Sequence, residues 1–238
     1  MTGPLPTSMN RLLFALPPED KALLTPHLSQ VELEKGRLLY EPGDLIDQAY
    51  FPTDCVLSLM TLMDNGAAIE SATIGREGAL GLMAAVAPRQ SLGRAIVQAP
   101  GSALRIAAAP LHEAWRRSAP LREVVDRHNE ALFGHAIQSV ACNALHAVEA
   151  RFCRWLLSCH DRLDTNTVCL TQEFLADMLG VQRTTVTAVA GSLQTKGVIR
   201  YRRGVVDILD RAGLEAMACE CYGAVRRGYE RLLPASFS

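Results

Sequence analysis

The chain has 238 residues, 49% of them hydrophobic, and a formal net charge of −1 at pH 7. This length suits two ordinary domains, each able to bury a core of its own. Charged residues or glycines interrupt every apolar run before it reaches the roughly 20 residues that a membrane helix needs, so we expect no membrane span.

The N-terminal residues predict a protein that is not exported. The stretch MTGPLPTSMNRLL has no basic head followed by an apolar block and a cleavage site, so we expect a cytoplasmic protein. The stretch PPEDKALLTPHL, residues 17–28, begins with prolines and acids, as helix N-termini do. It predicts a short helix ahead of the next segment.

Residues 31–106 have the pattern of short strands joined by turns. RLLYEPGD, residues 37–44, is a strand with a Pro-Gly turn, and residues 56–74 hold two apolar runs around Asp64-Asn65-Gly66. Asn-Gly accepts positive φ, which makes this a strong hairpin signal. Further strand-like runs follow at residues 94–98 and 102–106. The spacing predicts a small antiparallel barrel or sandwich.

From residue 110 the pattern becomes helical, with a break near residues 118–120 and then a Gly- and Pro-poor stretch to about residue 157. Two sets of residues recur at heptad spacing and form a partly apolar seam. The sets are Val125, Leu132 and Ser139, and His128, His135 and Cys142. This seam predicts a dimerising helix pair. We interpret the two histidines as a polar, partly exposed stripe; a pH sensor or a metal site across a dimer is the alternative.

Residues 172–191, QEFLADMLGVQRTTVTAVAG, have the pattern of two short helices joined by a turn. Ala176 stands where two helices would cross closely, and Gly180 stands at the turn, where positive φ is often required. Thr171 is the expected N-cap of the first helix. The positions expected to be buried are Leu175, Leu179, Val181, Val186 and Val189. A packed helical core without a further role would show many of the same letters.

The residues around this unit indicate binding to a polyanion. GVIRYRRGVVDIL, residues 197–209, alternates like two strands around a basic turn, which predicts a wing. Residues 17–80 hold 11 acids against 4 bases, whereas residues 151–203 hold 4 acids against 8 bases. Phosphate contacts need such cations, and base contacts need polar side chains in the major groove. The predicted DNA-contacting residues are Thr171, Gln172, Gln182, Arg183, Thr184, Thr187, Lys196, Arg200, Arg202 and Arg203.

Within this set Arg183 is the expected base-reading residue, because a guanidinium bonds bidentately to guanine O6 and N7. Thr184 and Thr187 can each contact a thymine methyl group or a phosphate. For each basic residue taken singly, a solvated surface charge is the alternative.

The order of strands, long helix and winged helix-turn-helix, with LTQEFLADMLGVQRTTVTAVAGSLQTKGVI, resembles the bacterial Crp/Fnr transcription regulators over roughly residues 15 to 210. The resemblance implies an α+β chain with a cyclic-nucleotide-binding-like β-barrel (jelly roll) at residues 1–118. It further implies a central dimerisation helix at 119–158 and a winged helix-turn-helix with a helical extension at 159–238. A homodimer on a pseudo-palindromic operator, and contact with RNA polymerase, are implied as well. The family's recognition helix often begins Arg-Glu-Thr-Val-x-Arg; here Arg183 matches, but Thr184 and Ala188 replace the Glu and the second Arg.

The resemblance also marks an effector site. In cyclic-nucleotide-binding members a Gly-Glu-Leu-Gly-Leu cassette supplies a carboxylate for the ribose, and a later Arg-Ser or Arg-Thr binds the cyclic phosphate. Here EGALGLMAAV, residues 77–86, has Ala79 at the carboxylate position, and Gly93-Arg94 replaces the Arg-Ser pair. We therefore expect no cyclic AMP binding and an unidentified small-molecule effector. The candidate residues are Gly78, Ala79, Leu80, Gly81 and Arg94.

The sequence indicates neither a cofactor nor an enzyme. The seven cysteines lack paired C-x-x-C spacings, and Cys219 and Cys221, if helical, would point in different directions. No nucleophile elbow, phosphate loop or metal-spaced histidine and carboxylate cluster is present. The tail at residues 210–233 predicts a helix capped by Asp210, with a break near Gly223, packed on the winged helix or on a dimer partner. A ligand-binding barrel, or a module whose winged helix binds a protein, are the alternative functions.

Overall fold

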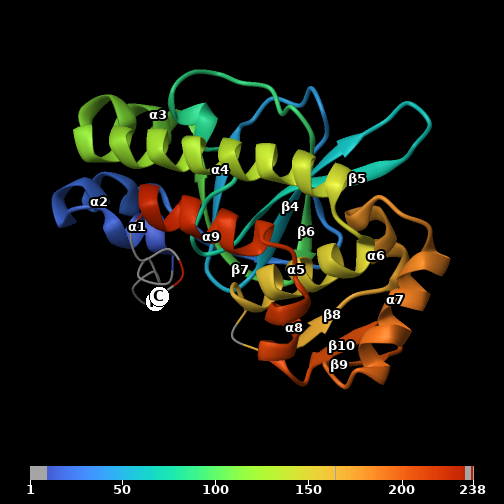
Figure 1. Cartoon of the computed structure of the whole chain (residues 1–238). Helices are drawn as coiled ribbons and strands as arrows, with labels where there is room; N and C mark the ends of the chain where they lie inside the picture. Colours follow the sequence, from blue (N-terminus) through green and yellow to red (C-terminus); the bar gives the residue numbers. More distant parts are fainter. Residues whose placement is uncertain (1–9, 164, 234–236, 238) are drawn as a thin grey trace.

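The computed structural model describes residues 10–163, 165–233 and 237. The expectation that the chain has no export signal rests largely on residues 1–9, which lie outside the described part. The N-terminal half is a β-sandwich flanked by helices, and the C-terminal part is a smaller winged-helix domain (Figure 1). The mixed α+β fold class predicted from the sequence is confirmed.

Two antiparallel sheets in jelly-roll-like arrangement form the N-terminal domain. One sheet has the order β1-β7-β3 and the other β2-β6-β4-β5. The predicted turn at residues 64–66 joins β4 to β5, and Gly66 there has φ 82°. The strands are β1 (Ser29–Leu33), β2 (Leu38–Tyr40), β3 (Gln48–Pro52), β4 (Val56–Leu62), β5 (Ala68–Ile74), β6 (Arg94–Ala99) and β7 (Gly101–Ala107).

Helices cover one side of the sandwich. Before the strands lie α1 (Arg11–Ala15) and α2 (Pro18–Leu24), the latter within the predicted helical range. After them come α3 (Ala108–Arg117) and the long α4 (Ala119–Leu145), separated at Ser118 as expected. The Ser118 side chain accepts a hydrogen bond from the Leu121 amide at 2.9 Å, which caps α4.

The winged-helix domain begins with α5, whose apolar side chains join the core of the helix-turn-helix. The helical stretch predicted to run to residue 157 is therefore two helices, with an extended break at His146 and Ala147. The elements are α5 (Val148–His160), β8 (Thr167–Cys169), α6 (Gln172–Leu179), α7 (Arg183–Thr195), β9 (Ile199–Arg202), β10 (Val205–Ile208), α8 (Arg211–Met217) and α9 (Cys221–Leu232).

The tail takes a different course from the predicted one. Asp210 caps α8 as expected, accepting from the Gly213 amide at 2.9 Å, but the break lies at residues 218–220, and Gly223 is inside α9. Helix α9 then runs back along α4 to the N-terminal domain (Figure 1). Its Tyr229 packs in the core formed by α1, α3 and α4, so the C-terminal helix is part of the N-terminal domain's core.

The heptad seam predicted for dimerisation is buried within the chain. His128 and His135 are 1% and 4% exposed, and Val125, Ser139 and Cys142 are buried beside them. The interpretation of the histidines as a partly exposed stripe is wrong. Helix α9 and the cassette after β5 cover this face of α4, because the tail returns to it.

Candidate nucleic-acid interface and effector cavity

The helix-turn-helix has the geometry that its sequence predicts. Thr171 Oγ1 accepts from the Phe174 amide at 3.2 Å and caps α6. Gly180 ends α6 with φ 62°, a left-handed conformation that favours glycine. Leu175, Leu179 and Val186 are buried, while Val181 and Val189 pack partly buried against the same core. These contacts fix the angle between α6 and α7.

The outward face at the start of α7 carries the predicted base-reading side chains. Gln182, Arg183, Thr184 and Thr187 are all exposed. Arg183 is held in place by neighbours on α6: Nη1 lies 2.9 Å from Glu173 Oε1, and Nε donates to Gln172 Oε1 at 3.2 Å. This exposed ion pair is weak in water. A DNA base edge can therefore replace it at small cost.

Thr187 on this face and Lys196 at the end of α7 make contacts of their own. Thr187 Oγ1 donates to the Arg183 carbonyl at 3.1 Å, and the residue is exposed. Lys196, at the end of α7, contacts Glu149 of α5 with 2.5 Å between Nζ and Oε1. The hydrogen bond from Lys196 lowers the pKa of the Glu149 carboxyl. Lys196 thus holds α7 to α5 as well as carrying a surface charge.

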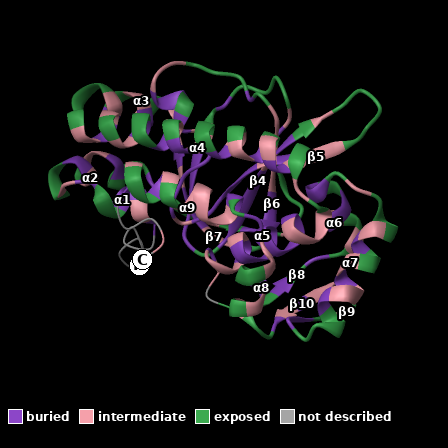
Figure 2. Ribbon diagram, in the orientation of Figure 1, coloured by how far each residue is buried: buried purple, intermediate pink, exposed green. Residues whose placement is uncertain are grey.

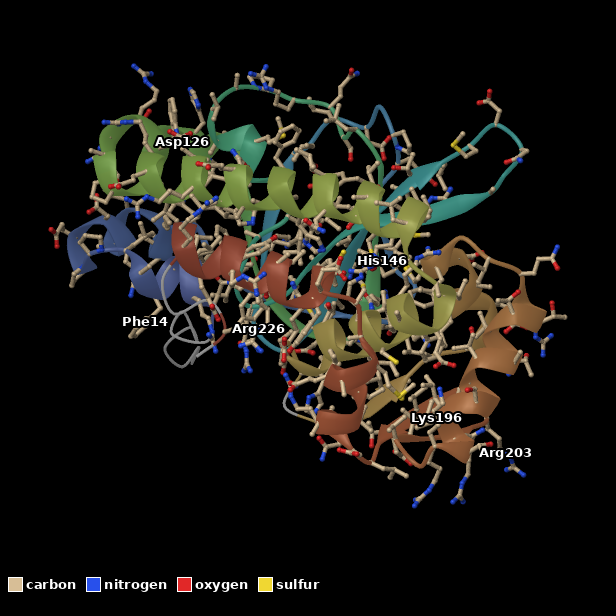
Figure 3. All side chains as sticks on the ribbon, viewed as in Figure 1. Phe14, Asp126, His146, Lys196, Arg203 and Arg226 are labelled. Atoms are coloured by element: carbon tan, nitrogen blue, oxygen red, sulfur yellow. The ribbon has the colours of Figure 1, made fainter. Side chains whose placement is uncertain are left out.

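The wing is a β-hairpin whose two-residue turn is basic. Strands β9 and β10 pair from Ile199↔Ile208 to Arg202↔Val205, and the turn residues Arg203 and Gly204 have φ 48° and 77°. Two consecutive positive φ values match the type I′ turn that joins twisted strands. Arg200, Arg202 and Arg203 are exposed. Figure 3 labels Arg203 at the outer edge of the winged-helix domain, with Lys196 nearby.

The winged-helix domain packs on the sandwich at β5 and at the turn between β1 and β2. A Cβ atom added at Gly180 would lie 2.7 Å from Ile69 Cδ1, and Lys35 Nζ donates to the Cys169 carbonyl at 2.5 Å. Two buried contacts reach further: Trp155 Nε1 donates to Glu70 Oε1 at 3.0 Å, and Arg162 Nη2 lies 2.7 Å from Glu77 Oε1. Glu77 is the first residue of the predicted effector cassette at residues 77–86, so the cassette is joined to the winged-helix domain.

A cavity of about 400 Å³ lies between the sandwich and α4, at the predicted effector site. Ala79, Leu80 and Gly81 line it, with apolar side chains from the strands and from α4. Gly78 lies behind them: a Cβ atom there would be 2.8 Å from His128 Nε2. Arg94 does not line this cavity, because its guanidinium makes two hydrogen bonds to Glu41, of 2.6 and 2.9 Å. No side chain of the described lining offers a charged partner for a phosphate.

A buried histidine connects this cavity with α4. His128 Nε2 accepts a hydrogen bond from the Ala79 amide at 3.1 Å. Nε2 is therefore unprotonated in this arrangement, and the ring proton is inferred to be on Nδ1. Burial lowers the pKa of His128 to about 4. The cassette thus contacts a neutral histidine at ordinary pH.

Two features of α4 were missed from the sequence. Phe133, Ile137 and Val140 are 68%, 55% and 72% exposed, and they share the face opposite the buried seam. Figure 2 shows exposed residues along the outward side of α4. Their spacing of four and three residues was the available signal. The second feature is the pair Cys142 and His146, one turn apart, which meets Cys219 and Cys221 from the tail.

Residues 150–217 match the family model of the Crp-like helix-turn-helix domain. No curated protein sequence matches the chain. Among solved structures, a Crp/Fnr-family transcriptional regulator from Eubacterium rectale superposes with a TM-score of 0.64 at 19% identity, covering 88% of this chain and 98% of that one. FixK2 from Bradyrhizobium japonicum gives a TM-score of 0.69 at 16% identity, covering 81% and 98%.

A third structure is the c-di-GMP responsive regulator CLP from Xanthomonas campestris, with a TM-score of 0.64 at 14% identity, covering 81% of this chain and 99% of that one. At these identities the similarity establishes the fold, which is that of the Crp/Fnr regulators. Within the described residues, every helix is too short or too polar to cross a membrane.

Proposed function

We infer that this chain, which combines the Crp/Fnr fold with a Crp-like helix-turn-helix domain, is a sequence-specific transcription regulator of the Crp/Fnr type. The observation that carries the proposal is the exposed polar start of α7 beside a basic wing. A helix of this kind enters the major groove, and cations beside it hold the register on phosphates. The proposed partner is double-stranded DNA.

The contacts divide into two groups in this proposal. Arg183 reads a guanine, with Gln182, Thr184 and Thr187 around it, while Arg200, Arg202, Arg203 and Lys196 bind phosphates. Thr171 and Gln172, at the start of α6, bind the DNA backbone in this proposal; Gln172 accepts a hydrogen bond from Arg183, and Thr171 precedes it. Since Glu173 pairs with Arg183 in the free protein, DNA has to displace that carboxylate.

The regulator is proposed to act as a homodimer through the exposed face of α4. Large apolar side chains exposed in a row mark an interaction site, and Phe133, Ile137 and Val140 form such a row. A twofold axis along this row would pair identical faces and present two α7 helices to a pseudo-palindromic operator. A cytoplasmic location and contact with RNA polymerase complete the proposal.

The cavity beneath α4 is proposed to bind a small effector that is mainly apolar. Ala79 offers no carboxylate for ribose hydroxyls, and Arg94 is engaged by Glu41 rather than directed at the cavity. Cyclic AMP should therefore release no heat on titration into the protein and leave the affinity for DNA unchanged. Saturable binding of cyclic AMP would refute this part, while leaving the DNA-binding proposal intact.

The alternative is a module whose winged helix binds a protein. The salt dependence of DNA binding separates the two functions. For a dimer with about four phosphate contacts per subunit, the logarithm of the affinity should fall with the logarithm of the salt concentration with a slope of about −7. Fluorescence anisotropy with a random 30-base-pair duplex measures this slope. A slope near zero would favour the alternative.

A further inference from the structure

Four potential metal ligands meet where the tail returns to α4. Cys142 and His146 lie one turn apart at the end of α4, while Cys219 and Cys221 flank the start of α9. Their ligand atoms all lie within 4.8 Å of one another. Cys142 Sγ is 3.5 Å from Cys219 Sγ, and Cys221 Sγ is 3.5 Å from His146 Nδ1. All three thiols are buried.

The helix break explains why sequence spacing did not predict this cluster. Cys219 lies in the extended segment between α8 and α9, since the preceding Ala218 has φ −72° and ψ 151°. Cys221 is the first residue of α9. Two cysteines separated by one residue would diverge on a continuous helix, but here the chain turns between them and both sulfur atoms reach Cys142 and His146.

We propose that Cys142, His146, Cys219 and Cys221 bind one zinc ion in each chain. A Cys₃His set is typical of closed, tetrahedral structural zinc sites. Bonds of about 2.0 to 2.3 Å in a tetrahedron separate neighbouring ligand atoms by roughly 3.3 to 3.8 Å. The distances of 3.5 Å fall in this range. The other ligand atoms lie within 4.8 Å of one another, so the set closes on an ion when side chains move by about 1 Å.

The groups around the ligands also suit a bound ion. His146 Nε2 lies 3.1 Å from Glu220 Oε1, so Nε2–H donates a hydrogen bond to the carboxylate and unprotonated Nδ1 is directed at the thiols. A histidine that is held by a carboxylate is the usual arrangement behind a zinc ligand. Gln138 Nε2 donates to Cys221 Sγ at 3.0 Å. Such N–H donors stabilise a thiolate.

The charges balance within the protein. Each of three cysteines loses a proton to solvent on binding, so three thiolates, a neutral imidazole and Zn²⁺ carry a net charge of −1. Arg154, which is 7% exposed and interacts electrostatically with Cys142, provides compensating positive charge. No oxidant or reductant is needed.

The proposed ion would connect three parts of the chain. His146 begins the break between α4 and α5, and the cysteines of the tail lie between α8 and α9. Figure 3 labels His146 at this junction, at the end of α4. A bound ion would tie the winged-helix domain and the returning tail to the end of α4. The site stands on these ligands alone and does not depend on DNA binding.

The test uses the full chain, stripped with a chelator under reducing conditions and titrated with Co²⁺ and then with Zn²⁺. One Co²⁺ per chain should produce the intense thiolate-to-cobalt charge-transfer absorption of a tetrahedral thiolate site, and one Zn²⁺ should abolish it. The wild-type spectrum decides the outcome even where a variant fails to fold. Absence of this absorption in the folded wild type would overturn the proposal.

Variants then assign the ligands. Glu220 supports a ligand rather than being one, so Glu220→Gln should weaken zinc binding about tenfold to a hundredfold. Cys142→Ser should abolish the charge-transfer band, or weaken zinc binding by more than Glu220→Gln does. Cys169→Ser is the control, because Cys169 is exposed and lies outside the cluster, and it should bind zinc like the wild type. Unchanged zinc affinity in Cys142→Ser, or a Cys142–Cys219 disulfide in a protein that takes up no metal after reduction, would overturn the proposal.

Discussion

The backbone amide of Ala79 donates a hydrogen bond to Nε2 of His128 over 3.1 Å, and this bond joins the effector cassette to the central helix α4. The imidazole is buried and lines the cavity. If Nε2 were protonated, its N–H would face the N–H of Ala79, and neither group could accept the other's hydrogen. The bond therefore exists only while His128 is neutral, which gives the fold a dependence on pH.

We predict that the protein loses stability as the pH falls below about 6.5, which is well above the pH range in which exposed carboxylates titrate. Burial lowers the pKa of His128 to about 4, whereas an unfolded chain has a histidine pKa near 6.5. The unfolded state binds the proton first, so the free energy of unfolding falls as the pH drops from about 6.5 towards 4. At pH 5.5 the loss from His128 is about 1.4 kcal/mol.

Neighbouring groups modify this pH dependence. Burial, with the charges of Arg162 and Arg154, lowers the pKa of His135 and adds to the loss of stability in acid. Burial raises the pKa of Glu70 and acts in the opposite direction, since protonation then favours the folded state. Urea denaturation of His128→Gln, which can still accept from Ala79, should show a shallower pH dependence. The same slope as in the wild type would contradict this assignment.

The tail should be an essential part of the N-terminal core. Tyr229 is 1% exposed, and its ring meets the His135 ring edge-on with 6.1 Å between centroids. Tyr229→Ala should lower the free energy of unfolding by about 3 to 5 kcal/mol, as for other large buried aromatic residues. Tyr229→Phe keeps the ring and is the control. A loss below about 1 kcal/mol in the alanine variant would mean that α9 leaves α4 readily.

A charge on the outward face of α4 should separate the proposed dimer. Val140 lies in the exposed apolar row, so Val140→Arg would place two cations against each other across a twofold axis. We expect a folded monomer by light scattering and circular dichroism. Glu113→Gln, on the exposed surface of α3, changes the charge by the same amount and should leave the dimer intact. A dimeric Val140→Arg variant would locate the interface elsewhere.

The wing offers a variant that removes a charge and keeps the turn. Arg203 has φ 48°, and asparagine tolerates this conformation better than most residues. Arg203→Asn should therefore fold like the wild type and lose one phosphate contact per subunit. For a dimer the salt slope of DNA binding should become less steep by about 1.8. An unchanged slope would remove Arg203 from the DNA interface.

The parts of the fold that depend on local chemistry could be predicted from the sequence. The turn at Asn65-Gly66, the cap at Thr171 and the left-handed Gly180 each follow from the conformational preference of the residues at that place. The helix-turn-helix and its outward residues could be predicted as well, because its buried positions recur at helical spacing within about 20 residues.

The remaining features depend on contacts between distant segments. Periodicity showed that His128, His135 and Cys142 share a face of α4, but it could not show that α9 and the cassette cover that face. The interpretation as a dimer seam failed for this reason. The meeting of Cys219 and Cys221 with α4 likewise depends on a helix break at residues 218–220 that contains no glycine or proline. The orientation of Arg94 depends on Glu41, which lies 53 residues away in the sequence.

The most direct test of the proposed function is selection of bound sequences from random duplexes by the full chain, with Arg183→Ala analysed in parallel. We predict a pseudo-palindrome with half-sites about one helical turn apart. Arg183→Ala should lose about 1 to 3 kcal/mol at one position of each half-site, with little loss on random DNA. No enrichment of any sequence, or an equal loss on selected and random duplexes, would contradict sequence recognition by α7.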